Sequence, residues 1–113
     1  MARTTFSGPV ASLNGFIGTT GATLTAVLKA TSTIDFGSIS AGATSDSTGI
    51  TVTGAATGDA VIVGAPAAIE AGLVVTAYVS AANTVKVRVA NVTGSPINPA
   101  SGSFTVVVVK ATV

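Results

Sequence analysis

The chain has 113 residues, with five basic and four acidic side chains and no His, Cys or Trp. This length suits a single domain. The near-neutral charge, without a basic cluster or an aromatic ladder, argues against nucleic-acid binding. The absence of His and Cys, with four carboxylates spread along the chain, argues against a zinc site and against catalytic groupings. We therefore expect a protein that is not an enzyme and needs no cofactor or metal.

The apolar residues are small. They make up 48% of the chain, but most are Ala and Val, and the aromatic residues are four Phe and one Tyr. At about 25 cal/mol per Å² of buried apolar surface, such a core stabilises a fold less than one of Leu and Phe. No disulfide compensates for this, so the composition predicts that the domain buries further surface against copies of itself.

Residues 1–22 are predicted to form an extended N-terminal arm, because Gly, Pro and Asn interrupt any regular element there. The arm carries spaced apolar anchors that could dock on a partner or on the same domain. These anchors are Phe6, Val10, Leu13, Phe16 and Ile17. An N-terminal strand followed by a loop of the same domain is the alternative. Neither an export signal, with about 7–15 continuous apolar residues, nor a membrane-spanning segment is expected.

Residues 23–113 are predicted to form the ordered domain. In the stretch 23–36, Leu24, Ala26 and Leu28 alternate with mostly polar residues, which favours a strand over a helix. The next stretch, GSISAGATSDSTG, is predicted to be a polar loop.

Shorter elements follow that loop. Ile50 and Val52 predict a short strand, and Asp59–Val63 predict the next one. The segment Pro66–Gly72 could hold one helical turn.

The clearest strand signals lie in the second half of the chain. Residues 73–80 and 84–92 flank a short link and predict a hairpin. In the second of these strands, Val85, Val87 and Val89 should be buried, while Lys86 and Arg88 face the opposite side.

The last strand signal is a run of four valines, Val106–Val109. This run predicts a strand inside a sheet that is covered on both faces, Val106 among its buried residues. In total we expect about seven strands in a small all-β sandwich or jelly-roll-like barrel.

Few side chains offer candidate chemistry. Lys86 and Arg88 project together and could contact an acidic partner surface, although a solvated strand face is the simpler interpretation. Asp46 and Asp59 could in principle share a calcium ion, but hard cations need several close oxygen ligands. The triplet Asn91-Val92-Thr93 matches a glycosylation acceptor, which we interpret as a chance match because no secretion signal is visible.

Four segments of the sequence resemble a module of tailed-bacteriophage structural proteins. They are DF-x-S-I-x-A-G at Asp35–Gly42, GD-x-V-x-VG-x-P at Gly58–Pro66, GL-x-x-x-A-x-V-S-A-x-N-T-V-x-V-R at Gly72–Arg88, and N-x-T-x-x-x-x-x-P-x-x-G-x-x-x-V at Asn91–Val106. The resemblance covers about two thirds of the chain and includes several polar positions. The opening, MARTTFSGPVASLNGFIG, also resembles the leader of small head-decoration proteins.

The resemblance implies a β-rich, commonly trimeric phage protein without catalytic residues. Capsid decoration (cement) proteins and head-fibre or tail-fibre modules both belong to this group. The chain shows no long coiled or collagen-like shaft, which favours decoration over a fibre tip. The expected partners are the major capsid protein and the chain itself as a homotrimer, and the expected location is the outer capsid surface after synthesis in the host cytoplasm. The alternative is a host-surface or carbohydrate-binding module of a fibre. An immunoglobulin-like domain of a bacterial surface protein is a more distant third.

Overall fold

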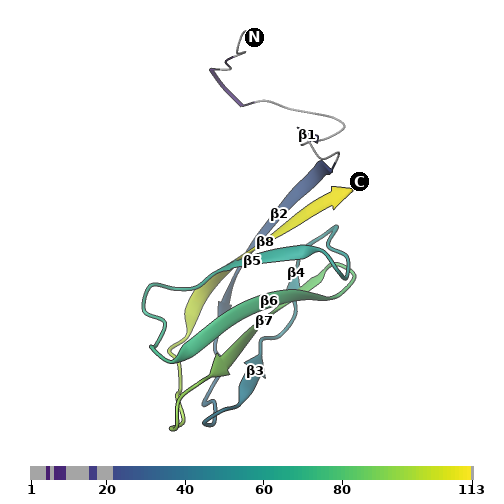
Figure 1. Cartoon of the computed structure of the whole chain (residues 1–113). Coiled ribbons are helices and arrows are strands. Elements are labelled where there is room, and N and C mark those ends of the chain that lie inside the picture. Colours follow the sequence, from purple (N-terminus) through teal and green to yellow (C-terminus); the bar gives the residue numbers. More distant parts are fainter. Residues whose placement is uncertain (1–4, 6, 10–15, 18–21, 113) are drawn as a thin grey trace.

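The protein is an all-β sandwich of two antiparallel sheets (Figure 1). The structure, a computed structural model, describes residues 5, 7–9, 16–17 and 22–112. Its strands are β1 (Phe16–Ile17), β2 (Thr23–Ile34), β3 (Thr44–Asp46), β4 (Ile50–Thr51), β5 (Ala60–Gly64), β6 (Leu73–Ala81), β7 (Thr84–Asn91) and β8 (Gly102–Thr112). The described residues include no helix, and thus none that could cross a membrane. The predicted all-β sandwich is confirmed.

The first sheet has the strand order β1-β2-β8-β5. The two long strands β2 and β8 pair along almost their whole length, from Thr23 opposite Thr112 to Ile34 opposite Gly102. On its other edge, β8 pairs with β5. β1 pairs with β2 only at Thr23 and Leu24, so the rest of that β2 edge has no strand partner among the described residues.

The second sheet is centred on β7, which pairs with β6 on one edge and with β3 and β4 on the other. The predicted hairpin is confirmed, with β6 and β7 joined by the two residues Ala82 and Asn83. Asn83 adopts a left-handed backbone (φ 61°), which Asn tolerates better than most residues. Its side-chain oxygen accepts a hydrogen bond from the Gly54 N–H at 2.8 Å, which ties this turn to the loop after β4.

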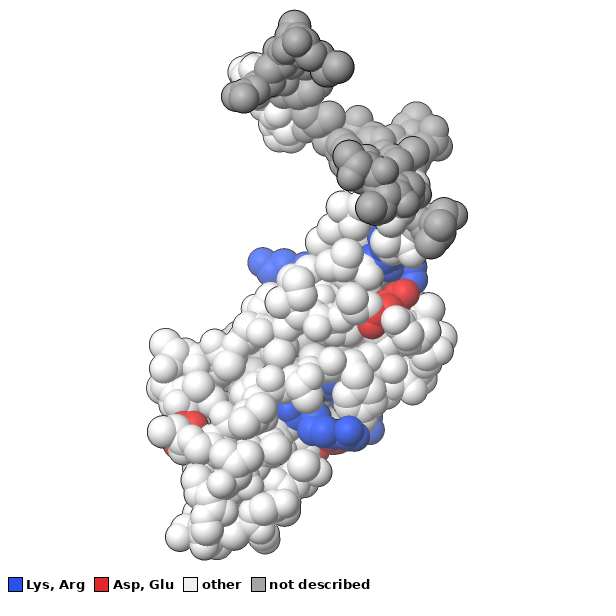
Figure 2. Space-filling view, viewed as in Figure 1, with Lys and Arg blue, Asp and Glu red and all other residues white. Residues whose placement is uncertain are grey.

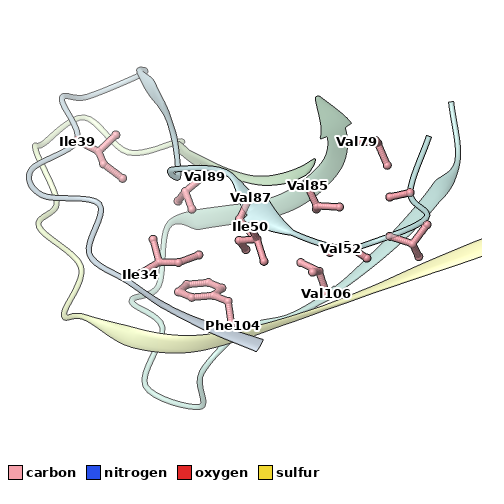
Figure 3. Close-up of a cluster of buried hydrophobic side chains, with 12 residues drawn as sticks. Ile34, Ile39, Ile50, Val52, Val79, Val85, Val87, Val89, Phe104 and Val106 are labelled. Atoms are coloured by element: carbon pink, nitrogen blue, oxygen red, sulfur yellow. The ribbon is translucent and has the colours of Figure 1, made fainter. Parts of the chain in front are cut away.

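The core lies between the inner faces of the two sheets (Figure 3). Alternate residues of β7 and β8 are fully buried there, and the ring of Phe36 meets that of Phe104 edge-on with centroids 5.7 Å apart. The buried apolar residues are Ile34, Ile39, Ile50, Val52, Ala55, Val79, Val85, Val87, Val89, Phe104, Val106 and Val108. The predicted burial of Val87 and Val106 is confirmed.

Two predictions of local structure are wrong. The segment Pro66–Gly72 holds no helical turn but two consecutive turns, closed by Ile69 N–H to Pro66 O (3.1 Å) and Leu73 N–H to Glu70 O (3.4 Å). The stretch 37–49 is not all loop, because β3 lies within it and pairs with β7. β3 reads Thr-Ser-Asp and carries no apolar signal, so its pairing partner defines it.

The expectation for Val106–Val109 is half correct. β8 does lie inside its sheet, between β2 and β5, and Val106 and Val108 are fully buried. Val107 and Val109 point to the outer face and are only half-buried, because no other described part of the chain covers that face. The prediction of cover on both faces is therefore wrong for the single chain.

Candidate functional site

A cluster of three polar side chains occupies the outer face of the second sheet. Asp46 on β3 lies opposite Arg88 on β7, and Tyr78 comes from the neighbouring β6. Arg88 donates to Asp46 twice, from Nε to Oδ1 at 2.6 Å and from Nη2 to Oδ2 at 2.9 Å. The Tyr78 hydroxyl donates to Asp46 Oδ2 at 2.7 Å and accepts from Arg88 Nη2 at 3.2 Å. The guanidinium also lies 4.7 Å from the centre of the Tyr78 ring.

These contacts stabilise the ionised forms of both charged groups. Hydrogen bonds from Arg88, and then from Tyr78, lower the pKa of Asp46 from 3.8 to about 2. The Asp46 carboxylate raises the pKa of Arg88 and also that of Tyr78, since its hydroxyl proton is held by a negative charge. A bidentate pair of this kind fixes geometry, so the cluster holds β3, β7 and β6 together.

The sequence predicted Lys86 and Arg88 as possible partner contacts, and among the residues that the structure describes only Arg88 of the two is in an ion pair. Arg88 is exposed, but its charge is already paired with Asp46. Lys86 lies opposite Tyr78 in the β6–β7 register, is half-buried and makes no ion pair with a described residue. Sequence reasoning had no signal that Asp46 and Tyr78 would join this cluster.

The second ion pair lies in the first sheet, between Lys110 on β8 and Asp59, which directly precedes β5. Lys110 Nζ donates to Asp59 Oδ2 at 2.5 Å, and the Ala56 N–H donates to the same oxygen at 2.9 Å. Both contacts lower the pKa of Asp59, the Lys110 contact more strongly. Asp46 and Asp59 are therefore each paired with a cation of the chain and do not share a site. Among the described residues, no three potential metal-ligating side chains gather together.

Asn91 is buried and serves as a polar anchor for the loops at one end of the sandwich. Its Nδ2 donates to the carbonyls of Ile39 (3.0 Å) and Ser95 (2.8 Å). Its Oδ1 accepts from the backbone N–H and the hydroxyl of Thr93, at 2.9 and 2.7 Å. Every hydrogen-bonding atom of the amide thus has a partner, as a buried polar group requires.

Part of the outer face of the first sheet is apolar, in contrast to the polar cluster. Val27 on β2 lies beside Val109 on β8, which lies beside Ala60 on β5. In the next row, Val107 lies between Ile62 on β5 and the exposed Lys29 on β2. Val27 and Ile62 are 59% and 61% exposed, and Val107 and Val109 are half-buried. We call the five apolar residues of these two rows the β2–β8–β5 face. Sequence analysis missed it, although Val27 stands at an outward position of its strand.

The arm anchors are only partly described. Phe16 and Ile17 form β1, which pairs with Leu24 and Thr23 at the start of β2. The anchors Phe6, Val10 and Leu13 lie outside the described residues. β1 therefore lies at the end of the β2–β8 pair where β2 begins (Figure 1).

Comparison with known proteins gives no relative. No protein-family model matches the chain, and no match was found among curated proteins or solved structures.

The surface is sparsely charged: a few basic and acidic side chains lie on an otherwise uncharged face (Figure 2).

Proposed function

We propose that this chain is a structural virion protein that decorates and stabilises the capsid of a tailed bacteriophage. It would bind the outer surface of the major capsid protein shell as a homotrimer. The observation that carries the proposal is a small β-sandwich that exposes Val27 and Ile62 on one outer face and pairs its N-terminal strand β1 with the start of β2. The resemblance of Asp35–Gly42, Gly58–Pro66, Gly72–Arg88 and Asn91–Val106 to phage structural modules supports the same conclusion.

The role follows from what a decoration protein must do. It attaches at many equivalent points of a shell, and sites where three capsomers meet match a closed threefold trimer. Its arm supplies apolar anchors for a groove or strand edge of the shell. Ordering each arm residue costs about 1–2 kcal/mol of backbone entropy, so the arm gains most when its anchors are buried against a partner.

The alternative, a carbohydrate-binding fibre module, has weaker support. Sugar sites usually present an exposed aromatic ring with polar groups around it. Tyr78 is the only tyrosine. Arg88 lies over its ring, and its hydroxyl is bonded to Asp46 and Arg88. This leaves the ring poorly suited as a sugar platform.

Deleting residues 1–20 tests the proposal. We expect the truncated protein to fold but to bind undecorated phage heads much more weakly than the full chain, because the apolar anchors are lost. Co-sedimentation with heads measures binding, and melting curves for both proteins check folding.

Three results would count against this picture. Equal binding by both proteins would assign attachment to the β domain alone. A truncated protein that fails to fold would make the arm, through β1, an integral part of the domain. Failure of the full chain to bind heads, and its absence from purified virions, would refute the decoration role.

A further inference from the structure

We infer that the β2–β8–β5 face is the surface on which copies of this chain pack against one another. In this arrangement, Val27, Ile62, Val107 and Val109 of each copy contact their equivalents near a common axis. The inference rests on the proposed function only for the number of copies, three. The face itself is identified from burial, charge and strand order.

The first argument is that the exposed apolar side chains of this face are contiguous. Val27 is opposite Val109 in the β2–β8 register, and Val107 is opposite Ile62 in the β8–β5 register. Side chains on one face of neighbouring strands lie about 4.5–5.5 Å apart. They therefore form one patch across three strands, and such patches on small soluble domains mark interaction sites.

The other two large aliphatic residues exposed in the described part of the chain, Val74 and Val92, do not lie opposite one another in a strand register. Val74 is 54% exposed on β6, but its register partner is Ala90, and the next outward residue on β6 is Thr76. Val92 lies in the loop after β7. Isolated apolar residues on a surface are ordinary and need no partner.

Charge favours a copy of the same chain as the occupant. The outward residues of β2, β8 and β5 include one charged side chain, Lys29 on β2, which lies opposite Val107, and no carboxylate. When identical faces meet, each charge approaches its own equivalent, so a face that lacks charge at its centre is compatible with itself. It also offers no charge pattern by which a different partner could be selected.

The position of Lys29 explains why the face, and not the strand edge, makes the contact. Beyond β1, the outer edge of β2 has no strand partner among the described residues, and such an edge invites pairing with another chain. Lysine on an edge strand opposes that pairing, and Lys29 is exposed on β2 itself. Because β2 lies beside the central strand β8, Lys29 lies at the β2 side of the face, next to Val107.

Substituting Ile62→Lys tests the inference. Ile62 is already exposed in the single chain, so the variant should fold, but in the assembly three ammonium groups would meet in an apolar contact. We expect wild type to sediment with the mass of three chains and Ile62→Lys with the mass of one. Val74→Lys is the matched control, because it adds the same charge at a similarly exposed strand position, and it should keep three chains.

The contrary outcomes are distinct. Wild type that stays a single chain at high concentration, or Ile62→Lys that keeps the mass of three chains, would overturn the inference. If Ile62→Lys keeps that mass but binds heads less well than Val74→Lys, the capsid shell covers the face instead, which also overturns it. A third outcome separates the two proposals. If wild type forms three chains and Ile62→Lys does not, but wild type fails to bind heads, only the decoration role is refuted.

Cross-linking gives a second, independent readout. The chain has no cysteine, so Ile62→Cys and Val74→Cys each introduce a single thiol. A short bismaleimide should link Ile62→Cys chains to one another and leave Val74→Cys chains unlinked at the same dilution. Equal linking of both variants, or linking of Val74→Cys alone, would contradict the proposed face.

Discussion

The outer faces of the two sheets differ in how their side chains are satisfied. Alternate residues of each sheet point into the shared core, and the remaining side chains point outward, where they either contact one another or stay exposed. On the second sheet, Asp46, Arg88 and Tyr78 pair with one another and use their polar atoms within the chain. The first sheet leaves Val27 and Ile62 exposed. A face that is satisfied internally needs no partner, whereas an apolar face gains free energy from one.

The largest difference in folding stability between substitutions on an inner and on an outer face is expected at β7. Val87→Asp should prevent folding, since Val87 is fully buried and an unpaired charge there costs about 4 kcal/mol or more. Domains of this kind are stable by only about 5–15 kcal/mol. Lys86→Ser, one position away, should be nearly neutral. Circular dichroism and thermal melting compare the two, and the reverse order would mean that the strand register is shifted by one residue.

A finer test uses two neighbouring valines of β8. Val108→Ala should destabilise the folded single chain by about 2 kcal/mol, because it removes two methyl groups from a packed core. Val107→Ala, on the outer face, should cost well under about 1 kcal/mol. Denaturant unfolding should be done on the Ile62→Lys background, where association is not expected to contribute. Similar losses for both variants would show that the outer face is packed within one chain.

The smallest expected effect concerns the ion pair of the second sheet. The folded pKa of Asp46, about 2, lies below its ordinary 3.8, so the pair stabilises the fold above pH 3.8 and ceases to do so as pH falls toward 2. Melting temperature should therefore decrease over that interval, and Asp46→Asn should weaken the dependence. Part of it should remain, since the pKa of Asp59 is also lowered. An unchanged pH profile for Asp46→Asn would mean that the pair is not formed in solution.

The sequence predicted those elements whose apolar residues alternate. The β6–β7 hairpin and the central position of β8 follow from valines spaced two apart, because burial of one strand face needs no knowledge of the neighbours. β3 could not be found this way: Thr44–Asp46 is a strand because β7 offers a free edge, and the Asp46–Arg88 contact joins residues far apart in the chain. The expected helical turn at Pro66–Gly72 is wrong because the bonds there join residues three apart, in two separate turns, whereas an α-helix joins residues four apart.

The candidate surfaces were harder to predict than the core. Whether Val107 and Val109 are covered depends on which strands and sheets lie over them, and strand order is not encoded in the periodicity of one strand. The valine run was correctly assigned to the interior of a sheet, but a sandwich of two sheets also has two outer faces that the sheets themselves do not cover. Within this run, Val106 and Val108 lie in the core, while Val107 and Val109 lie on the outer face that is proposed for assembly.

The burial of the Asn91 amide prevents sugar attachment at this residue once the domain has folded. In the folded domain its nitrogen is held by the carbonyls of Ile39 and Ser95, and the side chain has no room for a bulky substituent. A sugar could join Asn91-Val92-Thr93 only before folding, and the modified side chain could not then enter the core. Sugar attachment at Asn91 and formation of this sandwich are therefore mutually exclusive. Production in a glycosylating secretory pathway would divide the chains between the two fates, whereas production in a bacterial cytoplasm would not.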